Sequence, residues 1–304
     1  MPAWSAELPL VGAGGEPVDL WRTVLSHGLA SLPPARIDEA ARTLEITVPT
    51  RRGARTLTVR EAGPSRALVD GGAPARDGGE GLDRVRHLLR LDEDLSPFYA
   101  AVASDPALAW SARGAGRIFR SATVFEDVVK TICTTNCAWS ATERMVGALV
   151  AHLGEAAPGA PPDGPGGRAF PTPAAMAAAD ESFYREVARA GYRGAYLRSL
   201  AASVAGGALD LEVLARTSRE DLPDDELERR LLALPGVGPY AAAHIMMMLG
   251  RYSRLVLDSW TRPKYARLNG RPAKDSTILR RFRRYGPYAG LAFWLYLTRD
   301  WIAE

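Results

Sequence analysis

The stretch LPGVGPYAAAHIMMMLGRYSRLVLD, residues 234–258, joins two helical segments through a short glycine-rich turn. The residues before it space leucines at helical intervals, and Pro239 after the turn starts a second helix that continues through AAAHIMMML. Within the turn, Gly236 and Gly238 can take positive φ values and let another backbone approach closely. The sequence therefore predicts a helix, a hairpin and a helix over residues 224–250.

Such a hairpin presents backbone N–H groups beside the N-terminus of its second helix. Gly236, Val237 and Gly238 are therefore candidates for binding a phosphate of a nucleic-acid backbone without reading its bases. Ordinary helical corners also use Gly and Pro, so the hairpin alone leaves both interpretations open. A single carboxylate, Asp258, follows the last glycine by twenty residues.

LPGVGPYAAA followed by VLDSW resembles the helix-hairpin-helix superfamily of DNA glycosylases, in which an aspartate at this spacing catalyses removal of damaged bases. Residues 124–149, VFEDVVKTICTTNCAWSATERMVGAL, are similar to the helix, polar turn and helix that these enzymes press into the duplex. Residues 283–301, RRYGPYAGLAFWLYLTRDW, resemble the C-terminal helix of 8-oxoguanine DNA glycosylases. The resemblance extends from near Gly114 to the end of the sequence. The superfamily includes 3-methyladenine DNA glycosylase II.

The length and residue patterns predict two domains. Residues 1–85 place β-forming segments at 42–49 and 55–62 around helical spacing at 19–32, which predicts a small α+β domain with an antiparallel sheet. Helical patterns dominate residues 86–304, so the fold class is mainly α, and the resemblance implies a multihelical glycosylase domain there. Helices are predicted at 87–106, 124–134, 139–153, 173–189, 193–205, 224–234, 239–250, 259–268, 276–283 and 287–301. The Pro/Gly/Ala segment 155–169 is predicted to be a surface loop with nothing to bury.

The net charge of +3 is too small to indicate a nucleic-acid partner, but charge is unevenly distributed. Residues 251–284 contain eleven Arg and Lys against two Asp, a local balance of 11 − 2 = +9. Basic runs are usually solvated helix faces. Next to a phosphate-binding hairpin they favour contacts with the DNA backbone, and the candidates are Arg251, Arg254, Arg262 and Lys264.

Several classes of protein are not expected. No apolar run approaches the ~18 residues of a membrane span, and residues 1–10 lack the features of a signal peptide. A monomer in the cytoplasm, associated with the nucleoid through DNA, is therefore expected. Cys133 and Cys137 are the only cysteines, so the C-terminal four-cysteine iron–sulfur cluster of some superfamily members is excluded. No cofactor is expected to be required; the resemblance implies a possible Na⁺ or K⁺ at the hairpin carbonyls.

Asp258 is the candidate catalytic residue. Hydrolysis of an N-glycosidic bond develops positive charge on the sugar, so the site needs an anion near C1′ and a positioned water. Asp258 directly precedes SWTRPKYARL, a predicted helix that it could instead simply cap. In the superfamily the aspartate can do both, and the resemblance implies a catalytic role.

Tyr240 bears on whether the enzyme cuts the DNA strand after it removes the base. Members that also cut the strand carry a lysine in the second hairpin helix, which forms a Schiff base; Tyr240 stands at that position. The chain has only three lysines, Lys130, Lys264 and Lys274, and none is there. A monofunctional enzyme that leaves an abasic site is therefore expected. Tyr240 is a candidate for stacking on the extruded base, with packing at a helix start as the alternative.

Three residues are candidates for filling the space that the extruded base leaves. Asn136 aligns with the polar residue that 8-oxoguanine glycosylases place beside the orphaned partner base, and Tyr192 aligns with an aromatic wedge. Arg193 could accompany Tyr192 near the opposite strand. A helix cap or turn is the alternative for Asn136, and a buried aromatic is the alternative for Tyr192.

Four further residues complete the predicted base pocket. Trp139 follows the polar turn, and His244 lies one helical turn beyond Tyr240; packing roles are the alternative for both. Phe293 stands where 8-oxoguanine glycosylases have a base-reading glutamine, and Leu297 where they have a stacking phenylalanine. An aromatic, apolar pocket suits cationic alkylated purines, with 8-oxoguanine or another lesion as the alternative. A second alternative is a non-catalytic protein that binds damaged or bent DNA.

Overall fold

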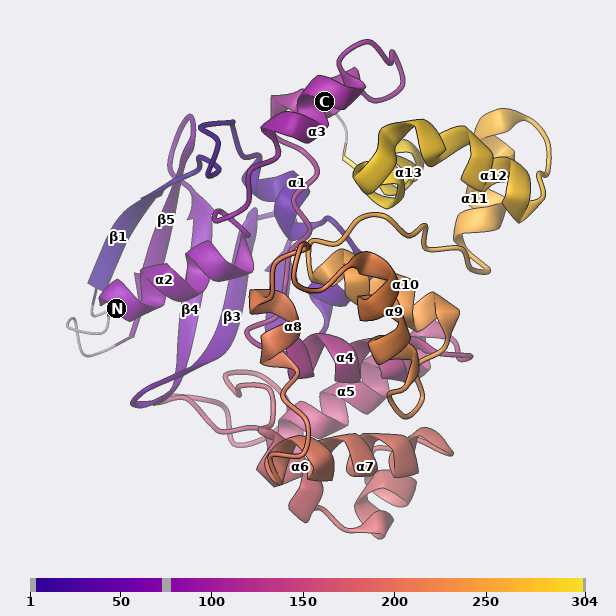
Figure 1. Cartoon of the computed structure of the whole chain (residues 1–304). Helices are drawn as coiled ribbons and strands as arrows, with labels where there is room; N and C mark the ends of the chain where they lie inside the picture. Colours follow the sequence, from indigo (N-terminus) through magenta and orange to yellow (C-terminus); the bar gives the residue numbers. More distant parts are fainter. Residues whose placement is uncertain (1–3, 73–77, 303–304) are drawn as a thin grey trace.

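A computed structural model of the chain describes residues 4–72 and 78–302. Residues 1–3 and 73–77 of the predicted N-terminal domain, and residues 303–304, lie outside the described residues. A five-stranded sheet occupies one side of the molecule, and helices α4 to α13 make up the other (Figure 1). The predicted fold class, mainly α with a small N-terminal antiparallel sheet, is confirmed.

The sheet is antiparallel throughout, in the order β1-β5-β4-β3-β2. Its strands are β1 (Trp4–Pro9), β2 (Ala35–Asp38), β3 (Thr43–Thr50), β4 (Gly53–Glu61) and β5 (Arg66–Gly71). The two β-forming segments read from the sequence are β3 and β4, in a register that pairs Leu44 with Val59 and Ile46 with Leu57. These four side chains are buried on one face, against which α2 (Gly78–Leu88) packs through Val85.

The segment 19–32, predicted with helical spacing, forms two short pieces. Helix α1 (Leu20–Val24) begins where the side chain of Asp19 accepts the N–H of Arg22 at 2.8 Å. The 3₁₀ turn η1 (Gly28–Ser31) follows after a break at His27, whose backbone is extended. This break brings His27 and Gly28 to the boundary with the helical domain. The predicted domain boundary after residue 85 falls within α2.

The helical domain carries the remaining elements, and most of them agree with the predicted segments. They are α3 (Ser96–Val102), η3 (Ala109–Arg113), α4 (Val124–Thr134), α5 (Trp139–Leu153), α6 (Pro173–Ala178), η4 (Phe183–Val187), α7 (Arg193–Ala205), α8 (Glu212–Arg216), α9 (Asp224–Leu232), α10 (Pro239–Met248), α11 (Thr261–Asn269), α12 (Asp275–Phe282), η5 (Arg283–Tyr288) and α13 (Ala289–Thr298). No described helix has both the length and the apolar character needed to cross a membrane.

Three predicted segments differ from the structure. The segment 173–189 is broken because Asp180 accepts the N–H of Phe183 at 2.8 Å and so starts a new π-helical turn, η4. The segment 87–106 is helical only at its start and in α3. The loop 155–169 does bury side chains: Ala157 and Ala169 pack on Ala54 of β4. A short run of alanines carries little pattern, which is why the sequence did not reveal this contact.

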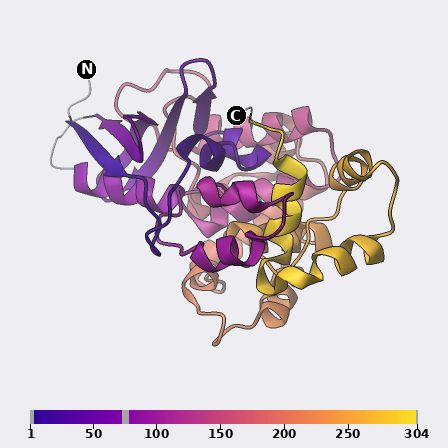
Figure 2. The same ribbon diagram turned by 90° about the horizontal axis from the view of Figure 1, so that it is seen from above.

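Helix α10 lies between two hydrophobic cores. Ala242, Ile245 and Met246 belong to the core that α4, α5, α7 and α9 share. Met247 and Met248 belong to the core built on α12 and α13. Figure 2 shows the sheet, in indigo to purple, and the C-terminal helices, in yellow, on opposite sides of the molecule. The side chains at the start of α10 therefore lie at the junction of the domain's two halves.

Candidate functional site

A cavity of about 390 Å³ lies beside the start of α10. Segments from both domains form its wall: the η1 turn, the ends of α4 and α5 that face each other, α10, the approach to α11, and α13. Its lining residues are Gly28, Leu29, Thr134, Cys137, Trp139, Thr142, Tyr240, His244, Asp258, Trp260, Trp294 and Trp301. This volume is within the range of ordinary small-molecule sites.

Asp258 lies at this cavity and also caps α11. Its Oδ1 accepts the backbone N–H groups of Trp260 at 2.8 Å and Thr261 at 2.6 Å, while its own N–H donates to Thr261 Oγ1 at 2.8 Å. This reciprocal arrangement holds the carboxylate rigidly at the helix N-terminus. Both accepted bonds use Oδ1, and none of the described residues donates to Oδ2. The capping role that the sequence left open is therefore present, in a side chain that also lines the cavity.

Tyr240 and His244 form the inner wall, one helical turn apart on α10. The Tyr240 hydroxyl lies 3.2 Å from Thr134 Oγ1 and 3.4 Å from His244 Nδ1. Burial raises the pKa of Tyr240, and the nearby charge of Asp258 adds to this effect. Burial lowers the pKa of His244 to about 4, so its imidazole is neutral at physiological pH.

Tryptophans supply most of the remaining wall. Trp139, at the start of α5, lines the cavity and is 42% exposed. Trp260, Trp294 and Trp301 form a cluster with ring centroids 5.5 to 5.9 Å apart. None of these last three was predicted from the sequence. Because these tryptophans come from separate segments, no regular spacing in the sequence indicates that they lie together.

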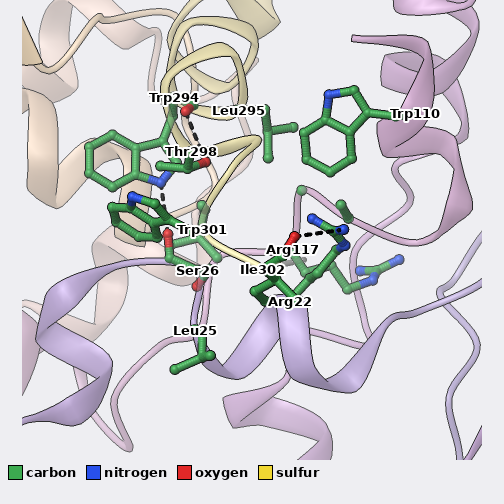
Figure 3. Close-up of a pocket in the computed structure, with 13 residues that line it drawn as sticks. Arg22, Leu25, Ser26, Trp110, Arg117, Trp294, Leu295, Thr298, Trp301 and Ile302 are labelled. Carbon is green, nitrogen blue, oxygen red and sulfur yellow. Dashed lines mark hydrogen bonds between the residues drawn. The ribbon is translucent and has the colours of Figure 1, made fainter. Parts of the chain in front are cut away.

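A hydrogen bond from its indole ring holds Trp294 in place. Figure 3 shows its indole Nε1 donating to the carbonyl of Ser26, and the Thr298 hydroxyl donating to the Trp294 carbonyl. The indole bond is 2.7 Å long and joins α13 to the segment after α1. A second cavity, of about 20 Å³, shares Trp294 and Trp301 with the first and has room for a water molecule only. The cavity of about 390 Å³ that Asp258 lines is therefore the candidate base pocket.

Phe293 and Leu297 do not line the cavity, which corrects the prediction for both. Each is completely buried in the core of α12 and α13, and the Phe293 ring contacts Tyr265 and Phe282 with centroids 6.2 and 5.2 Å away. Helix α13 is apolar on all sides, so its sequence contains no periodicity from which its rotation could be inferred. The side chain that faces the cavity is the neighbouring Trp294.

A second hollow joins the hairpin to the predicted wedge residues. It has a volume of about 510 Å³. Asn136 is exposed in the turn between α4 and α5, where its φ of 47° is in the left-handed region that Asn tolerates. Tyr192 is 54% exposed, and its ring contacts Tyr196 edge to face. The hollow is lined by Thr135, Asn136, Tyr192, Tyr196, Gly236, Val237, Gly238, Pro239, Tyr240 and Ala241.

Arg193 does not face this hollow as a free cation, which corrects its predicted place near the opposite strand. It is 6% exposed and donates to the carbonyls of Thr135 and Asn136, the latter at 3.0 Å. Its guanidinium also lies 4.6 Å from the Tyr192 ring centroid. Arg193 thus braces the turn that presents Asn136 and positions Tyr192 beside it.

The hairpin has the backbone geometry that its glycines allow. Gly236 has a φ of 78°, and a Cβ there would lie 2.8 Å from the Tyr196 ring. Gly238 is extended and precedes α10, whose first-turn N–H groups have no intrahelical acceptors. These donors lie at the hollow that Asn136 also lines. An anion placed there would meet backbone N–H groups at a helix N-terminus.

All four cations predicted to contact the DNA backbone are engaged within the protein. Arg251 is buried against Asp224 at 2.7 Å, and Arg254 pairs with Glu228 at 2.8 Å and with Asp225. Arg262 holds Asp275 with two bonds of 2.8 Å, and the buried Lys264 holds Asp300 at 2.6 Å. The local charge count left out the acids that pair with Arg251, Arg254 and Lys264, which lie outside residues 251–284. Contacts of Arg251, Arg254, Arg262 and Lys264 with the DNA backbone remain a prediction.

Solved structures of DNA glycosylases share this fold. MBOgg1 in complex with a low-affinity DNA ligand superposes with a TM-score of 0.73 at 20% identity, over 98% of this chain and 96% of that one. The 3-methyladenine DNA glycosylase of Archaeoglobus fulgidus gives 0.71 at 18% identity, over 99% and 100%. The apo 8-oxoguanine glycosylase/lyase of Clostridium acetobutylicum gives 0.72 at 20% identity, over 96% and 95%.

Neither a family model nor a curated protein matches the chain. The structural similarity nevertheless covers nearly the full length of each protein. The chain therefore shares the fold of these DNA glycosylases.

Proposed function

We propose that this protein is a DNA glycosylase that extrudes a damaged purine, most favourably an alkylated one, and hydrolyses its N-glycosidic bond. The observation that carries this proposal is the position of Asp258. Its carboxylate is held at a helix N-terminus on the wall of an aromatic cavity, next to Tyr240. The hairpin hollow shares Tyr240 with that cavity, so a candidate binding site for the DNA backbone adjoins the candidate base pocket.

Asp258 provides the chemistry that the reaction needs. As the bond from C1′ to the base breaks, its electron pair leaves with the base and positive charge develops on the sugar. A carboxylate near C1′ stabilises that charge. Oδ2 is free to orient the attacking water and accept its proton, because Oδ1 is committed to the two backbone N–H groups. The product is an abasic site and a free base.

The cavity wall supports an alkylated purine as the substrate. Tyr240, Trp139, Trp260, Trp294 and Trp301 present aromatic surface. Aromatic faces attract cations through their quadrupole, and an alkylated purine carries delocalised positive charge. Such a base is also a good leaving group, so one carboxylate suffices. The similar Clostridium acetobutylicum protein is named an 8-oxoguanine glycosylase/lyase, which makes 8-oxoguanine the alternative substrate.

The lysines support a reaction that ends with base removal. No lysine lines the cavity in the described part of the chain. Lys130 is buried against Glu126 at 2.7 Å, Lys264 is buried against Asp300, and Tyr240 occupies the position that a Schiff-base lysine would need. A covalent imine requires an accessible amine at C1′. A Na⁺ or K⁺ at the hairpin carbonyls remains a prediction from the resemblance.

Asp258→Asn tests the proposal. The substrate is a duplex that carries a single N7-methylguanine or N3-methyladenine, labelled on the damaged strand. We expect the wild type to release the base and leave an alkali-labile site, and the variant to lose at least ~10²-fold in the single-turnover rate, because a neutral amide cannot stabilise the sugar cation. DNA binding by the variant, measured by fluorescence anisotropy, is expected to stay within about twofold because no phosphate contact is lost.

Three outcomes would redirect the proposal. Release of 8-oxoguanine but not of alkylated bases would select the alternative substrate. Strand breaks without added alkali would contradict the absence of lyase activity. Tight binding to damaged duplexes with no base released from a broad lesion panel would leave a non-catalytic binder.

A further inference from the structure

His244, which lines the cavity, contacts His27, which lies behind it and is not a lining residue, and each has a buried ring nitrogen without a hydrogen-bond partner. They are His244 Nε2 on α10 and His27 Nδ1 in the segment before η1. The rings lie edge to face, with centroids 6.1 Å apart and an interplanar angle of 87°. Buried polar atoms are nearly always satisfied, so a pair of unsatisfied atoms in one place indicates a missing partner.

The hydrogen-bond network around Tyr240 assigns the tautomer of His244. The Thr134 hydroxyl has one proton, and its shortest contact is the Thr131 carbonyl at 2.7 Å, which can only accept. Thr134 Oγ1 must then accept from the Tyr240 hydroxyl at 3.2 Å. With its proton committed, the Tyr240 oxygen accepts from His244 Nδ1 at 3.4 Å. His244 therefore carries its proton on Nδ1, and Nε2 presents a lone pair.

A similar argument applies to His27. Its Nε2 lies 2.6 Å from the Phe119 carbonyl, so Nε2 carries the proton and donates it. Burial lowers the pKa of His27 to about 3, and His244 adds to this effect, so the ring is neutral. His27 Nδ1 is therefore also a bare acceptor. Two acceptors cannot satisfy each other, and His244, the one that lines the cavity, requires an N–H or O–H donor from outside the protein.

We propose, on the basis of the proposed glycosylase function, that His244 is a specificity-determining residue whose Nε2 accepts a hydrogen bond from the exocyclic 6-amino group of the extruded base. His27 is a positioning residue behind it. A primary amino group can donate one of its protons to His244 Nε2. Guanine and 8-oxoguanine instead carry a carbonyl oxygen at the 6 position, and its lone pairs would face those of the imidazole. The site therefore favours alkyladenines.

A matched pair of free bases tests this selectivity. 3-Methyladenine and 3-methylhypoxanthine differ in whether an amino or an oxo group occupies the 6 position. Their binding to the full chain at pH 7 can be measured through quenching of the cavity tryptophans. We expect 3-methyladenine to bind about tenfold more tightly, because leaving a buried acceptor without a donor weakens binding by about that factor. Equal binding, tighter binding of the oxo analogue, or no binding of either would overturn the proposal.

Two variants connect that selectivity to His244. His244→Phe removes the acceptor, and we expect the preference to fall to about one. Tyr240→Phe removes the acceptor of the Nδ1 proton, so the imidazole is free to change tautomer and the preference should also decrease. Circular dichroism and thermal unfolding establish that each variant is folded; an unchanged preference in folded His244→Phe would contradict the assignment.

Histidine ¹⁵N spectra provide a readout in the wild type that does not depend on any variant. We expect Nε2 of His244 and Nδ1 of His27 to be the unprotonated nitrogens of their rings, and a change at His244 when 3-methyladenine binds. The opposite tautomer at His244 would overturn the proposal. Because neither measurement uses excision, failure here is distinct from failure of the proposed function, which the Asp258→Asn assay decides.

Discussion

At the scale of single residues, the positions that could be predicted all belong to continuous motifs. Asp258, Tyr240 and Asn136 sit at set distances from the hairpin or within a polar turn, and the structure places all three at the two adjoining hollows. Trp260 and Trp294 could not be found in this way. Their place in the wall depends on how separate helices rotate, which local patterns do not encode.

Trp294 and Phe293 offer a matched test of which residue on α13 contacts the base. We expect Trp294→Leu to lower kcat/KM on an alkylated duplex by about 10- to 100-fold, since aromatic stacking on a base contributes about 1 to 3 kcal/mol. Single-turnover kinetics at varied enzyme concentration measure the effect.

The control is Phe293→Leu. This side chain is buried between Tyr265 and Phe282, so the variant should unfold at lower temperature with kcat/KM within about threefold of wild type. The reverse result, with activity lost in Phe293→Leu and kept in Trp294→Leu, would show that α13 is rotated relative to this structure.

At the scale of elements, ion pairs connect segments that the local charge count treated as a DNA surface. Arg251 and Arg254 tie the segment after α10 to the first turns of α9, and so close the helix-hairpin-helix unit from behind. Several helices could be predicted, because α4 and α9 have strong apolar periodicity and α10 begins at Pro239. The acids that pair with Arg251 and Arg254 could not be predicted, because they lie on another segment of the chain.

Arg251→Met tests the structural role of that arginine. The guanidinium is 7% exposed and donates to Asp224 and to the Leu222 carbonyl, so its removal leaves buried groups without partners. We expect the free energy of unfolding to fall by about 3 kcal/mol. Urea denaturation measures this change.

DNA affinity as a function of salt is the accompanying control. A phosphate contact contributes to the slope of log K against log salt, whereas an internal ion pair does not. We expect the slope for Arg251→Met to equal that of the wild type. A slope reduced by about one unit would instead indicate that Arg251 contacts a DNA phosphate.

At the scale of the whole molecule, a buried carboxyl group near the start of α4 makes stability depend on pH. Asp127 is buried there and accepts the backbone N–H of Ser121 at 3.1 Å. Burial, with Glu126 adding to it, raises the pKa of Asp127 from 3.8 to about 7. The folded protein therefore binds a proton that the unfolded chain releases at lower pH.

Asp127 makes stability depend on pH. Because its folded pKa is raised, its contribution is fully present below pH 4 and is lost as pH rises through 7. We expect Asp127→Asn, which keeps the acceptor without a charge, to be more stable than the wild type by a few kcal/mol at pH 8, and to lose most of that advantage by pH 4. Thermal unfolding at both pH values checks this. An advantage independent of pH would contradict the assignment, and Asp83→Asn, an exposed substitution, is the control.

Helix α10, enclosed by one core on each side, restricts how this protein could change its substrate. Nearly every side chain from Ala241 to Met248 is needed for packing, so enlarging or reshaping the cavity from that wall would cost stability at once. The tryptophans come from three other segments, and three of them, Trp139, Trp260 and Trp301, are 42%, 38% and 40% exposed. Variation in lesion range among relatives should therefore accumulate at this replaceable rim, while α10 stays the same.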